Sequence, residues 1–213
     1  TIEFTLACLV VQFTIGFLFA MFFSKKFTLA GPIRGLVLVG YMMPMSVTAL
    51  LGKNLFLLDG GVINDLLMKV HLISSPIDWL VNGGTALGAV IAVNCWVGIP
   101  FNMLLLTSGL TGISTDIYES ASMDGANAFK RFIYITLPLM KPAMLSVLML
   151  GFIYTFKAFD LMYIMTAGGP FNSTDVLGTY AYSKAFTQYE FSQGSAIAMV
   201  LFACLFLVGI FYL

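Results

Sequence analysis

The chain has 213 residues, of which 60% are hydrophobic and 9% are charged, and its mean hydropathy is +0.97. Soluble domains carry about a quarter charged residues, so the composition excludes an ordinary soluble domain and indicates an all-α, polytopic helical membrane protein in a lipid bilayer. The formal net charge is zero, which gives no indication of a nucleic-acid partner.

Five apolar runs are long enough to cross a bilayer at about 1.5 Å of rise per residue. They cover about 5–23, 35–52, 85–107, 141–162 and 194–213. Lys25 and Lys26 end the first run, and Pro44 interrupts the second. A proline within a membrane span frees backbone groups, which neighbouring helices or a water-lined cavity must satisfy. We therefore expect either a plain kink or a cavity beside Pro44.

The segment 53–84 is polar, and its apolar residues predict a short amphipathic helix near the membrane interface. In the third run, Asn94, Gly98 and Asn102 follow one another at intervals of four residues, so they share one helical face. Amides inside a membrane usually face a bundle interior or a cavity. The alternatives are a cavity-lining face and a set of hydrogen bonds that holds the bundle together.

The segment 114–138 has mixed character and lies between two apolar runs, and from Tyr118 to Pro138 it reads YESASMDGANAFKRFIYITLP. We expect Asp116 to cap a short helix, with Glu119 three residues later as a capping box. Gly125 stands where a left-handed helix end needs a glycine. A second short amphipathic helix should follow, and Pro138 should open the next apolar run.

The fourth run contains Lys157 and Asp160, which are three residues apart and can pair on one helical face or extend to the interface. The following segment, 166–192, is rich in turn-forming and aromatic residues. Basic residues set the orientation: the links at 24–34 and 108–141 hold six Lys and Arg, against three in the opposite loops. The positive-inside rule therefore places the segment 114–138 in the cytoplasm.

Several site types lack the residues they need. The three cysteines have no paired or metal-ligand spacing, and His71 is alone and expected in a loop. The sequence has no G-x-x-x-x-G-K pattern, so we expect no P-loop and no bound cofactor. The chain lacks an initial Met and begins just ahead of an apolar run, so we expect an upstream span to be missing.

The pattern E-x-A-x-x-D-G-A, followed by I-x-L-P, resembles the EAA loop of permeases of ABC importers. Ser120 departs mildly from the alanine that is usual at its position. In that family the loop is a coupling helix that docks into a cytoplasmic ATPase, and the resemblance implies that role for the residues at matching positions. They are Glu119, Ser120, Ala121, Asp124, Gly125, Ala126, Leu137 and Pro138.

Outside this loop the chain resembles, nearly from end to end, the carbohydrate branch of type I importer permeases. The matching pieces are DGGVIN at 59–64, Trp79-Leu80, Trp96 with Pro100-Phe101, FKAFD at 156–160 and TAGGP at 166–170. The resemblance implies one transmembrane domain over 1–213 in a bacterial or archaeal cell membrane. Its partners would be a second, homologous permease, two ATPase subunits that hold ATP and Mg, and an extracytoplasmic solute-binding protein.

The same resemblance implies a pathway for a sugar or oligosaccharide. The matching positions are Tyr41, Asn94, Gly98, Gly151, Tyr154, Thr155, Ala158 and Asp160. Asn102 is added to this predicted pathway because it shares the helical face of Asn94 and Gly98. Aromatic faces and directional polar groups suit a polyol. An ion-coupled secondary transporter would need intramembrane acids, for which Asp160 is the sole candidate. A membrane-embedded enzyme would need a cluster of His, Asp or Glu at the interface, and no such pattern is recognisable.

Overall fold

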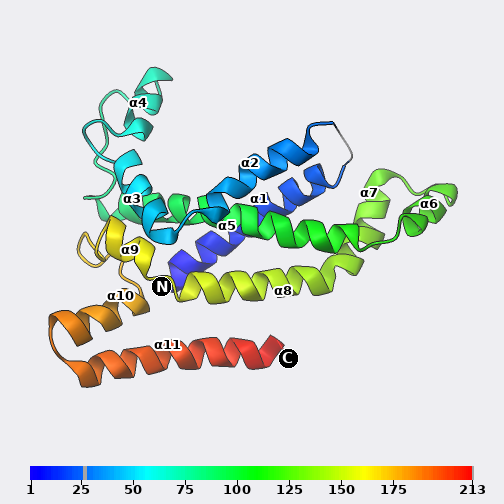
Figure 1. The fold of residues 1–213 in the computed structure, drawn as a ribbon. Helices are drawn as coiled ribbons and strands as arrows, with labels where there is room; N and C mark the ends of the chain where they lie inside the picture. Colours follow the sequence, from blue (N-terminus) through cyan, green and yellow to red (C-terminus); the bar gives the residue numbers. More distant parts are fainter. Residues whose placement is uncertain (26–27, 213) are drawn as a thin grey trace. The chain divides into compact units, whose positions relative to one another are not determined.

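The computed structural model describes residues 1–25 and 28–212, so Lys26, one of the predicted cytoplasmic cations, lies outside the described residues. Eleven α-helices and two π-helical segments follow one another (Figure 1). They are α1 (Ile2–Phe23), α2 (Ala30–Met42), α3 (Met45–Leu55), α4 (Val62–Lys69), α5 (Gly83–Thr111), α6 (Thr115–Met123), α7 (Ala128–Arg131), η1 (Phe132–Thr136), α8 (Leu137–Phe156), α9 (Asp160–Met165), α10 (Leu177–Tyr182), η2 (Ser183–Thr187) and α11 (Phe191–Tyr212).

The predicted all-α membrane class is confirmed. Four helical runs of the described chain are long and apolar enough to cross a membrane, or five if the interrupted pair of α2 and α3 counts as one span. The predicted interruption lies at Pro44, where the helix stops at Met42 and restarts at Met45. Pro44 itself has extended backbone, with φ −55° and ψ 138°.

The predicted fourth span, 141–162, is wrong at both ends. One continuous helical run extends over Ala128–Phe156, through α7, η1 and α8. At the far end the helix stops at Phe156, and α9 restarts at Asp160. Lys157 and Asp160 therefore do not share a helical face, and the predicted pair does not form among the described residues; the Lys157 ammonium instead lies 5.1 Å from the centre of the Tyr154 ring.

The chain forms two compact units, which are described separately. Unit 1 comprises Thr1–Cys8, Met42–Trp96 and Phe152–Leu213, and unit 2 comprises Leu9–Tyr41 and Val97–Gly151. Three long helices, α1, α5 and α8, contribute residues to both units. The single transmembrane domain expected over 1–213 stays a prediction.

Unit 2 is held together by close contacts of α5 with α1 and α8. A Cβ atom on Gly16 of α1 would lie 2.6 Å from Cβ of Asn102, and one on Gly109 would lie 2.7 Å from Cβ of Ala143 on α8. Small residues let helices approach closely, which matters in a membrane because lipid tails are as apolar as leucine. The buried centre of this packing is formed by Ala20, Leu106, Met140 and Val147.

In unit 1 a buried asparagine joins three segments of the loop region. Asn64 on α4 donates hydrogen bonds to the carbonyls of Leu57 and Ile77, at 3.1 and 3.0 Å. Its Oδ1 accepts from the Ile77 N–H and, at 2.9 Å, from Trp79 Nε1. The predicted amphipathic helix of the segment 53–84 is thus α4, fixed to its surroundings through one side chain. His71 lies in the turn after it, as expected.

The C-terminal part of unit 1 ends in α11, which turns back onto α10 through η2 (Figure 1). Lys184 Nζ donates to Glu190 Oε2 at 3.0 Å just before α11 begins, and this carboxylate raises the pKa of Lys184. A Cβ atom on Gly194 would lie 2.7 Å from Cβ of Ala185, so glycine permits the close turn.

Replacing Asn64 with leucine should lower the melting temperature of the purified protein by several degrees. The change leaves the N–H groups of Ile77 and Trp79 and the carbonyls of Leu57 and Ile77 without this partner. Each unsatisfied buried group costs about 1–3 kcal/mol. The matched control is Asn54→Leu, because the exposed Asn54 side chain bonds only to the Leu50 carbonyl of its own helix. Equal melting temperatures for the two variants would contradict the role of Asn64.

Candidate functional site

The polar segment after α5 folds as a short helix, a glycine turn and a second short helix. Ser114, in extended backbone, accepts a hydrogen bond from the Asp116 N–H at 3.3 Å and so caps α6. The predicted Asp116 cap with Glu119 as its capping box is therefore wrong. Asp116 already lies in the first turn of the helix, where its negative charge is favoured by the helix dipole.

The turn after α6 explains the D-G-A part of the pattern. Gly125 has φ +76°, which confirms the predicted left-handed conformation. Its N–H donates to the Ser122 carbonyl at 3.1 Å, and the Ala126 N–H donates to the Ala121 carbonyl at 2.9 Å. These two bonds define a Schellman motif, which commonly brings the residue at the position of Ala126 against the residue at the position of Ala121. Both alanines are half-buried while their neighbours are exposed.

The second helix joins the membrane-crossing helix without a break. Asn127 caps α7 by accepting from the Lys130 N–H at 2.9 Å. The chain then passes through the π-helical turn η1, where the Leu137 N–H donates to the Phe132 carbonyl five residues earlier. Pro138 follows as the second residue of α8, so the proline opens α8 as predicted but does not start a new run. The wider π turn changes the hydrogen-bond register just ahead of the missing proline N–H.

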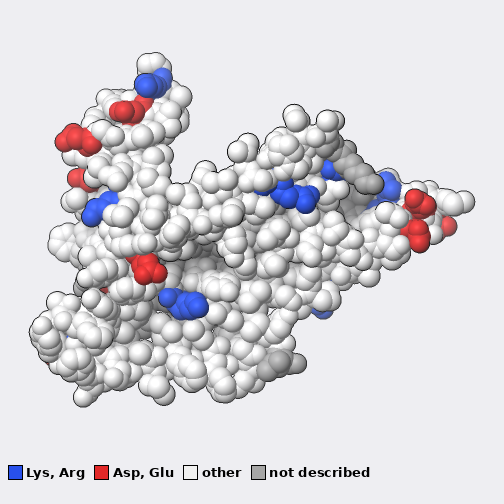
Figure 2. All heavy atoms as spheres, viewed as in Figure 1, with Lys and Arg blue, Asp and Glu red and all other residues white. Residues whose placement is uncertain are grey.

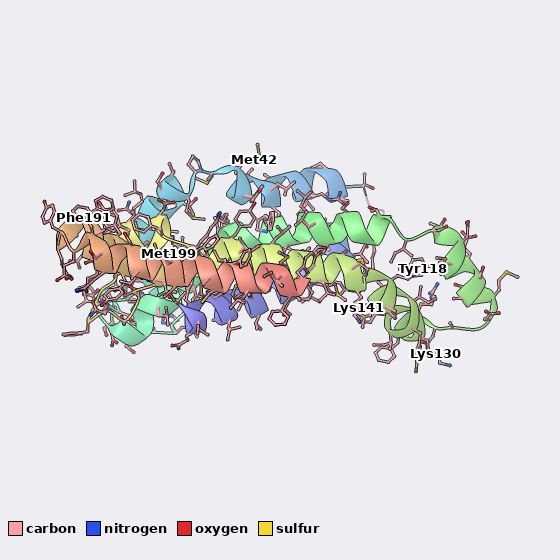
Figure 3. The ribbon with its side chains drawn as sticks, turned by 90° about the horizontal axis from the view of Figure 1, so that it is seen from below. Met42, Tyr118, Lys130, Lys141, Phe191 and Met199 are labelled. Atoms are coloured by element: carbon pink, nitrogen blue, oxygen red, sulfur yellow. The ribbon has the colours of Figure 1, made fainter. Side chains whose placement is uncertain are left out.

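Side chains link α6 to α7 and to η1, the turn just before α8. Tyr118 Oη lies 2.9 Å from Oγ1 of the buried Thr136, across 18 residues. Arg131 Nη1 donates to Ser122 Oγ at 2.7 Å, and Ser122 Oγ in turn donates to the Tyr118 carbonyl. In Figure 3, Tyr118 lies on the inner side of α6 and Lys130 at the outer edge of the segment. The two short helices are therefore held to each other and to α8.

The outer surface of this segment is apolar and acidic. Met123 and Phe129 are 90% and 72% exposed, and Ile117 and Tyr134 are also exposed. Figure 2 shows acidic side chains gathered at the end of the segment, where α6 carries Asp116 and Glu119. Exposed large apolar side chains on a polar element are typical of a surface that a partner protein covers.

The structure gives the predicted coupling residues different positions. Glu119, Ser120, Asp124, Gly125 and Pro138 are exposed. Ala121, Ala126 and Leu137 are half-buried. The prediction missed the residues that hold the segment rigid, since hydrogen bonds over 9 and 18 residues leave no periodic signal in the sequence. They are Tyr118, Ser122, Arg131 and Thr136.

The two links that were assigned to one side of the membrane do meet in unit 2. Thr111, at the end of α5 and just before the segment, lines a pocket together with Phe23, Lys25 and Arg34 from the turn between α1 and α2. The ends of α1 and α5 therefore lie at the same end of unit 2, as the alternation of spans requires.

Two of the residues proposed for a substrate route lie in helix packing. A Cβ atom on Gly98 would lie 2.1 Å from the Gln12 side chain of α1, so Gly98 faces that helix. Asn102 is buried and donates to the Gly98 carbonyl of its own helix at 2.8 Å. Gly98 and Asn102 therefore contact α1 in unit 2, and the choice between the two alternatives for this face stays a prediction. In unit 1, Asn94 is also buried and contacts the Cys8 thiol.

The remaining route residues have mixed surroundings. Tyr41 is exposed on one side, and its ring stacks on Phe101 with centres 5.5 Å apart. Gly151 packs against Leu9, since a Cβ atom there would lie 3.0 Å from it. Tyr154 and Asp160 are exposed, Thr155 is buried and Ala158 is half-buried. A substrate role for these positions stays a prediction.

Replacing Gly125 with valine should speed hydrogen exchange of the last amides of α6 about tenfold, because a branched residue at positive φ costs roughly 1–2 kcal/mol. The matched control is Gly112→Val, at a glycine just before α6 that does not have positive φ. Hydrogen-exchange mass spectrometry of the segment measures both. Unchanged exchange in the Gly125 variant would mean that the Schellman turn does not hold α6.

Comparison with known proteins agrees with this architecture. Residues 12–213 match the family model described as the binding-protein-dependent transport system inner membrane component. The trehalose/maltose transport system permease of Thermococcus litoralis is 31% identical over the whole chain, which spans 71% of that protein. The sulfoquinovosyl glycerol transport system permease of Agrobacterium fabrum is 32% identical over 91% of the chain, which spans 62% of that protein.

A Brucella suis protein named as a probable ABC transporter permease is 32% identical over 84% of the chain, and the match spans 62% of its length. Among solved structures, a bacterial ABC transporter involved in alginate import superposes with a TM-score of 0.85 at 19% identity, covering 99% of the chain and 75% of the matched chain. That likeness shows the type I permease fold. The chain belongs to the family of binding-protein-dependent transport system inner membrane components, the permeases of ABC transporters.

Proposed function

We propose that this chain is the membrane-spanning permease subunit of an ATP-driven importer and that segment 114–138 couples it to a cytoplasmic ATPase. One observation carries the proposal. A rigid helix–glycine–helix element exposes apolar and acidic side chains and continues without a break into the helical run Ala128–Phe156. Movement of a partner that grips α6 would therefore reach the membrane-crossing helix directly.

The proposed cargo is a sugar or oligosaccharide. The supporting observation is the naming of relatives at 31–32% identity as permeases for trehalose and maltose and for sulfoquinovosyl glycerol. The exposed aromatic ring of Tyr41 is of the kind on which a sugar ring can stack. An ion-coupled secondary transporter is not supported, because the family and these relatives are ABC transporter components.

The proposed partners are a second homologous permease, two ATPase subunits that hold ATP and Mg, and an extracytoplasmic solute-binding protein. The family description and one similar solved structure, a bacterial alginate ABC transporter in complex with an alginate pentasaccharide-bound periplasmic protein, support the last of these. The chain itself is proposed to bind no cofactor and to catalyse no hydrolysis. The setting would be a bacterial or archaeal cell membrane, with segment 114–138 in the cytoplasm.

The loop at 166–174 in unit 1 offers a surface for the solute-binding protein. It follows the helical run that starts at segment 114–138, so it emerges on the other side of the membrane. Thr174 Oγ1 donates to the Gly169 carbonyl at 2.7 Å and lies 2.7 Å from Thr166 Oγ1, which closes the loop. Phe171 projects from it fully exposed. An exposed aromatic ring on a closed loop is a suitable anchor for a soluble partner.

Charge reversal at Glu119 should uncouple transport. Glu119→Lys removes an exposed carboxylate that is available to a basic ATPase residue, and a hydrogen bond to a charged group contributes about 1.5–3 kcal/mol, so uptake should fall tenfold or more. Uptake of labelled sugar in cells and co-purification of the ATPase measure the effect.

The control for this change is Asp65→Lys on α4, an equal charge reversal at the other end of α5. It should leave ATPase co-purification unchanged. Full uptake by a well-expressed Glu119→Lys complex would refute the coupling role, whereas loss of uptake with the ATPase still bound would place the defect in transmission.

Labelling of single cysteines should reveal the orientation. Ser120→Cys in α6 and Val81→Cys before α5 are both at exposed positions. After Cys204→Ser, and with Cys8 and Cys95 buried, an impermeant thiol reagent added to intact cells should label Val81→Cys and spare Ser120→Cys. Labelling of Ser120→Cys alone would reverse the proposed orientation.

A further inference from the structure

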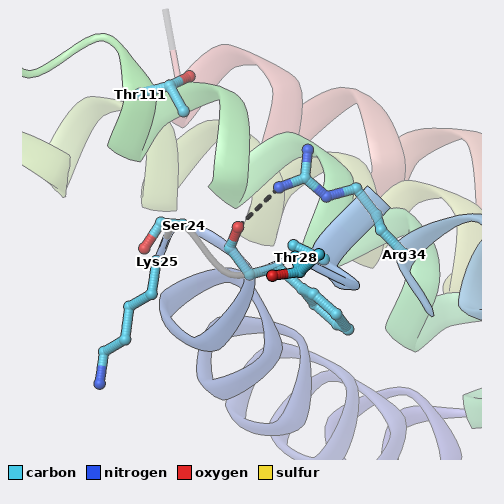
Figure 4. Close-up of a pocket in the computed structure, with 7 residues that line it drawn as sticks. Ser24, Lys25, Thr28, Arg34 and Thr111 are labelled. Carbon is cyan, nitrogen blue, oxygen red and sulfur yellow. Dashed lines mark hydrogen bonds between the residues drawn. The ribbon is translucent and has the colours of Figure 1, made fainter. Parts of the chain in front are cut away.

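A polar pocket that the coupling role does not use lies where α1 ends and α2 begins. Its volume is about 550 Å³ (Figure 4). It is lined by Ser24, Lys25 and Thr28 from the turn, Arg34 from α2 and Thr111 from the end of α5. All of these residues belong to unit 2, and none of the described residues that line the pocket is acidic.

The cation inside this pocket is only partly satisfied by the protein. Arg34 Nη2 donates to the Phe23 carbonyl at 2.8 Å, at the end of α1. Arg34 Nε is buried and has no hydrogen-bond partner in the described part of the chain. A guanidinium has five N–H donors, so Arg34 keeps donors for a further acceptor. Lys25 lies at the rim, and in Figure 4 its side chain extends away from Arg34.

The surrounding groups suit a phosphate. Arginine binds phosphate oxygens through its planar fork of donors. The pocket also includes Thr28 and Ala30 at the start of α2, a helix of 13 residues whose first N–H groups have no acceptor within the helix. The hydroxyl of Ser24 donates to the Met21 carbonyl and the hydroxyl of Thr111 donates to the Ser108 carbonyl.

Apolar side chains beside the pocket are exposed in a way that suits acyl chains. Phe22, near the end of α1, and Leu29 and Leu36, at the start and middle of α2, are each more than half exposed. The pocket itself lies at the ends of α1 and α5, which is the level of the headgroups for helices that cross the bilayer. Basic pockets between membrane helices are known to hold the headgroups of anionic lipids.

We propose that the pocket at the α1–α2 turn binds the phosphate of an anionic phospholipid, with Arg34 as its principal ligand and Lys25 at its rim. The lipid would come from the leaflet on the side of segment 114–138. Its phosphate would receive the free donors of Arg34, and its acyl chains would lie along Phe22 and Leu36. A soluble phosphate shares the headgroup chemistry but lacks the acyl chains.

The test uses the full-length permease in its purified transporter complex, placed in nanodiscs of phosphatidylcholine with increasing phosphatidylglycerol. The melting temperature of the native complex should rise with the phosphatidylglycerol fraction, and native mass spectrometry should detect retained phosphatidylglycerol. Lys25→Gln should weaken the apparent lipid affinity about fivefold, because one basic residue near an anionic surface contributes about that factor. Arg34→Gln should abolish the shift, and Arg34→Lys should keep part of it.

The matched control is Lys141→Gln, which removes an exposed charge on α8 outside the pocket and should retain the full shift. A second arm adds inorganic phosphate to nanodiscs of phosphatidylcholine alone, where no shift is expected. A shift equal to that of phosphatidylglycerol would overturn the lipid assignment. An equal loss in Lys141→Gln, or wild-type affinity in Lys25→Gln and Arg34→Gln, would also overturn it. If Arg34→Gln does not assemble, Lys25→Gln against Lys141→Gln decides.

Discussion

Close packing of α5 against α1 and α8 is the constraint on which the functional segment depends. Apolar side chains gain little by leaving lipid for another helix, so geometry must supply the attraction between membrane helices. Gly16 and Gly109 provide that geometry in unit 2, since a side chain at either position would collide with the facing helix. Segment 114–138 begins three residues after α5 ends and runs directly into α8. This packing therefore fixes both ends of segment 114–138 independently of the contacts within the segment.

Features that depend on one residue and its neighbours were predictable from the sequence. Gly125 predicts the left-handed turn and Pro44 the broken span, because each acts through its own backbone. Features decided by competition were not. Ser114 and Asp116 are both residue types that cap helices well. Ser114 is the cap of α6 because its extended backbone directly precedes the helix. The fourth span begins earlier than predicted because the helix continues through η1 ahead of Pro138, and hydropathy does not reveal a π turn.

Polar residues within the spans were harder to interpret, because the same chemistry serves two purposes. An amide in a membrane must find a partner, and a substrate route and a helix interface both supply one. Asn102 bonds to its own helix and its Cβ lies against Gly16, so part of this face packs against α1. Gly98 meets Gln12 on the same face. A period of four residues identifies which side chains share a face, but the facing residue on α1 decides what that face does.

The internal bonds of segment 114–138 are those that the proposed coupling role would need for a small element to transmit force. The Schellman turn fixes α6 relative to α7, and the contact of Tyr118 with Thr136 fixes it relative to the foot of α8. Bending α6 away from α8 would break several hydrogen bonds, each with a net contribution of about 1 kcal/mol. Moving α6 together with α8 breaks none of them. A partner that pulls on α6 at the exposed Met123 therefore meets less resistance from motion of α6 together with α8 than from local unfolding of α6. The force would then be transmitted along the continuous helical run Ala128–Phe156.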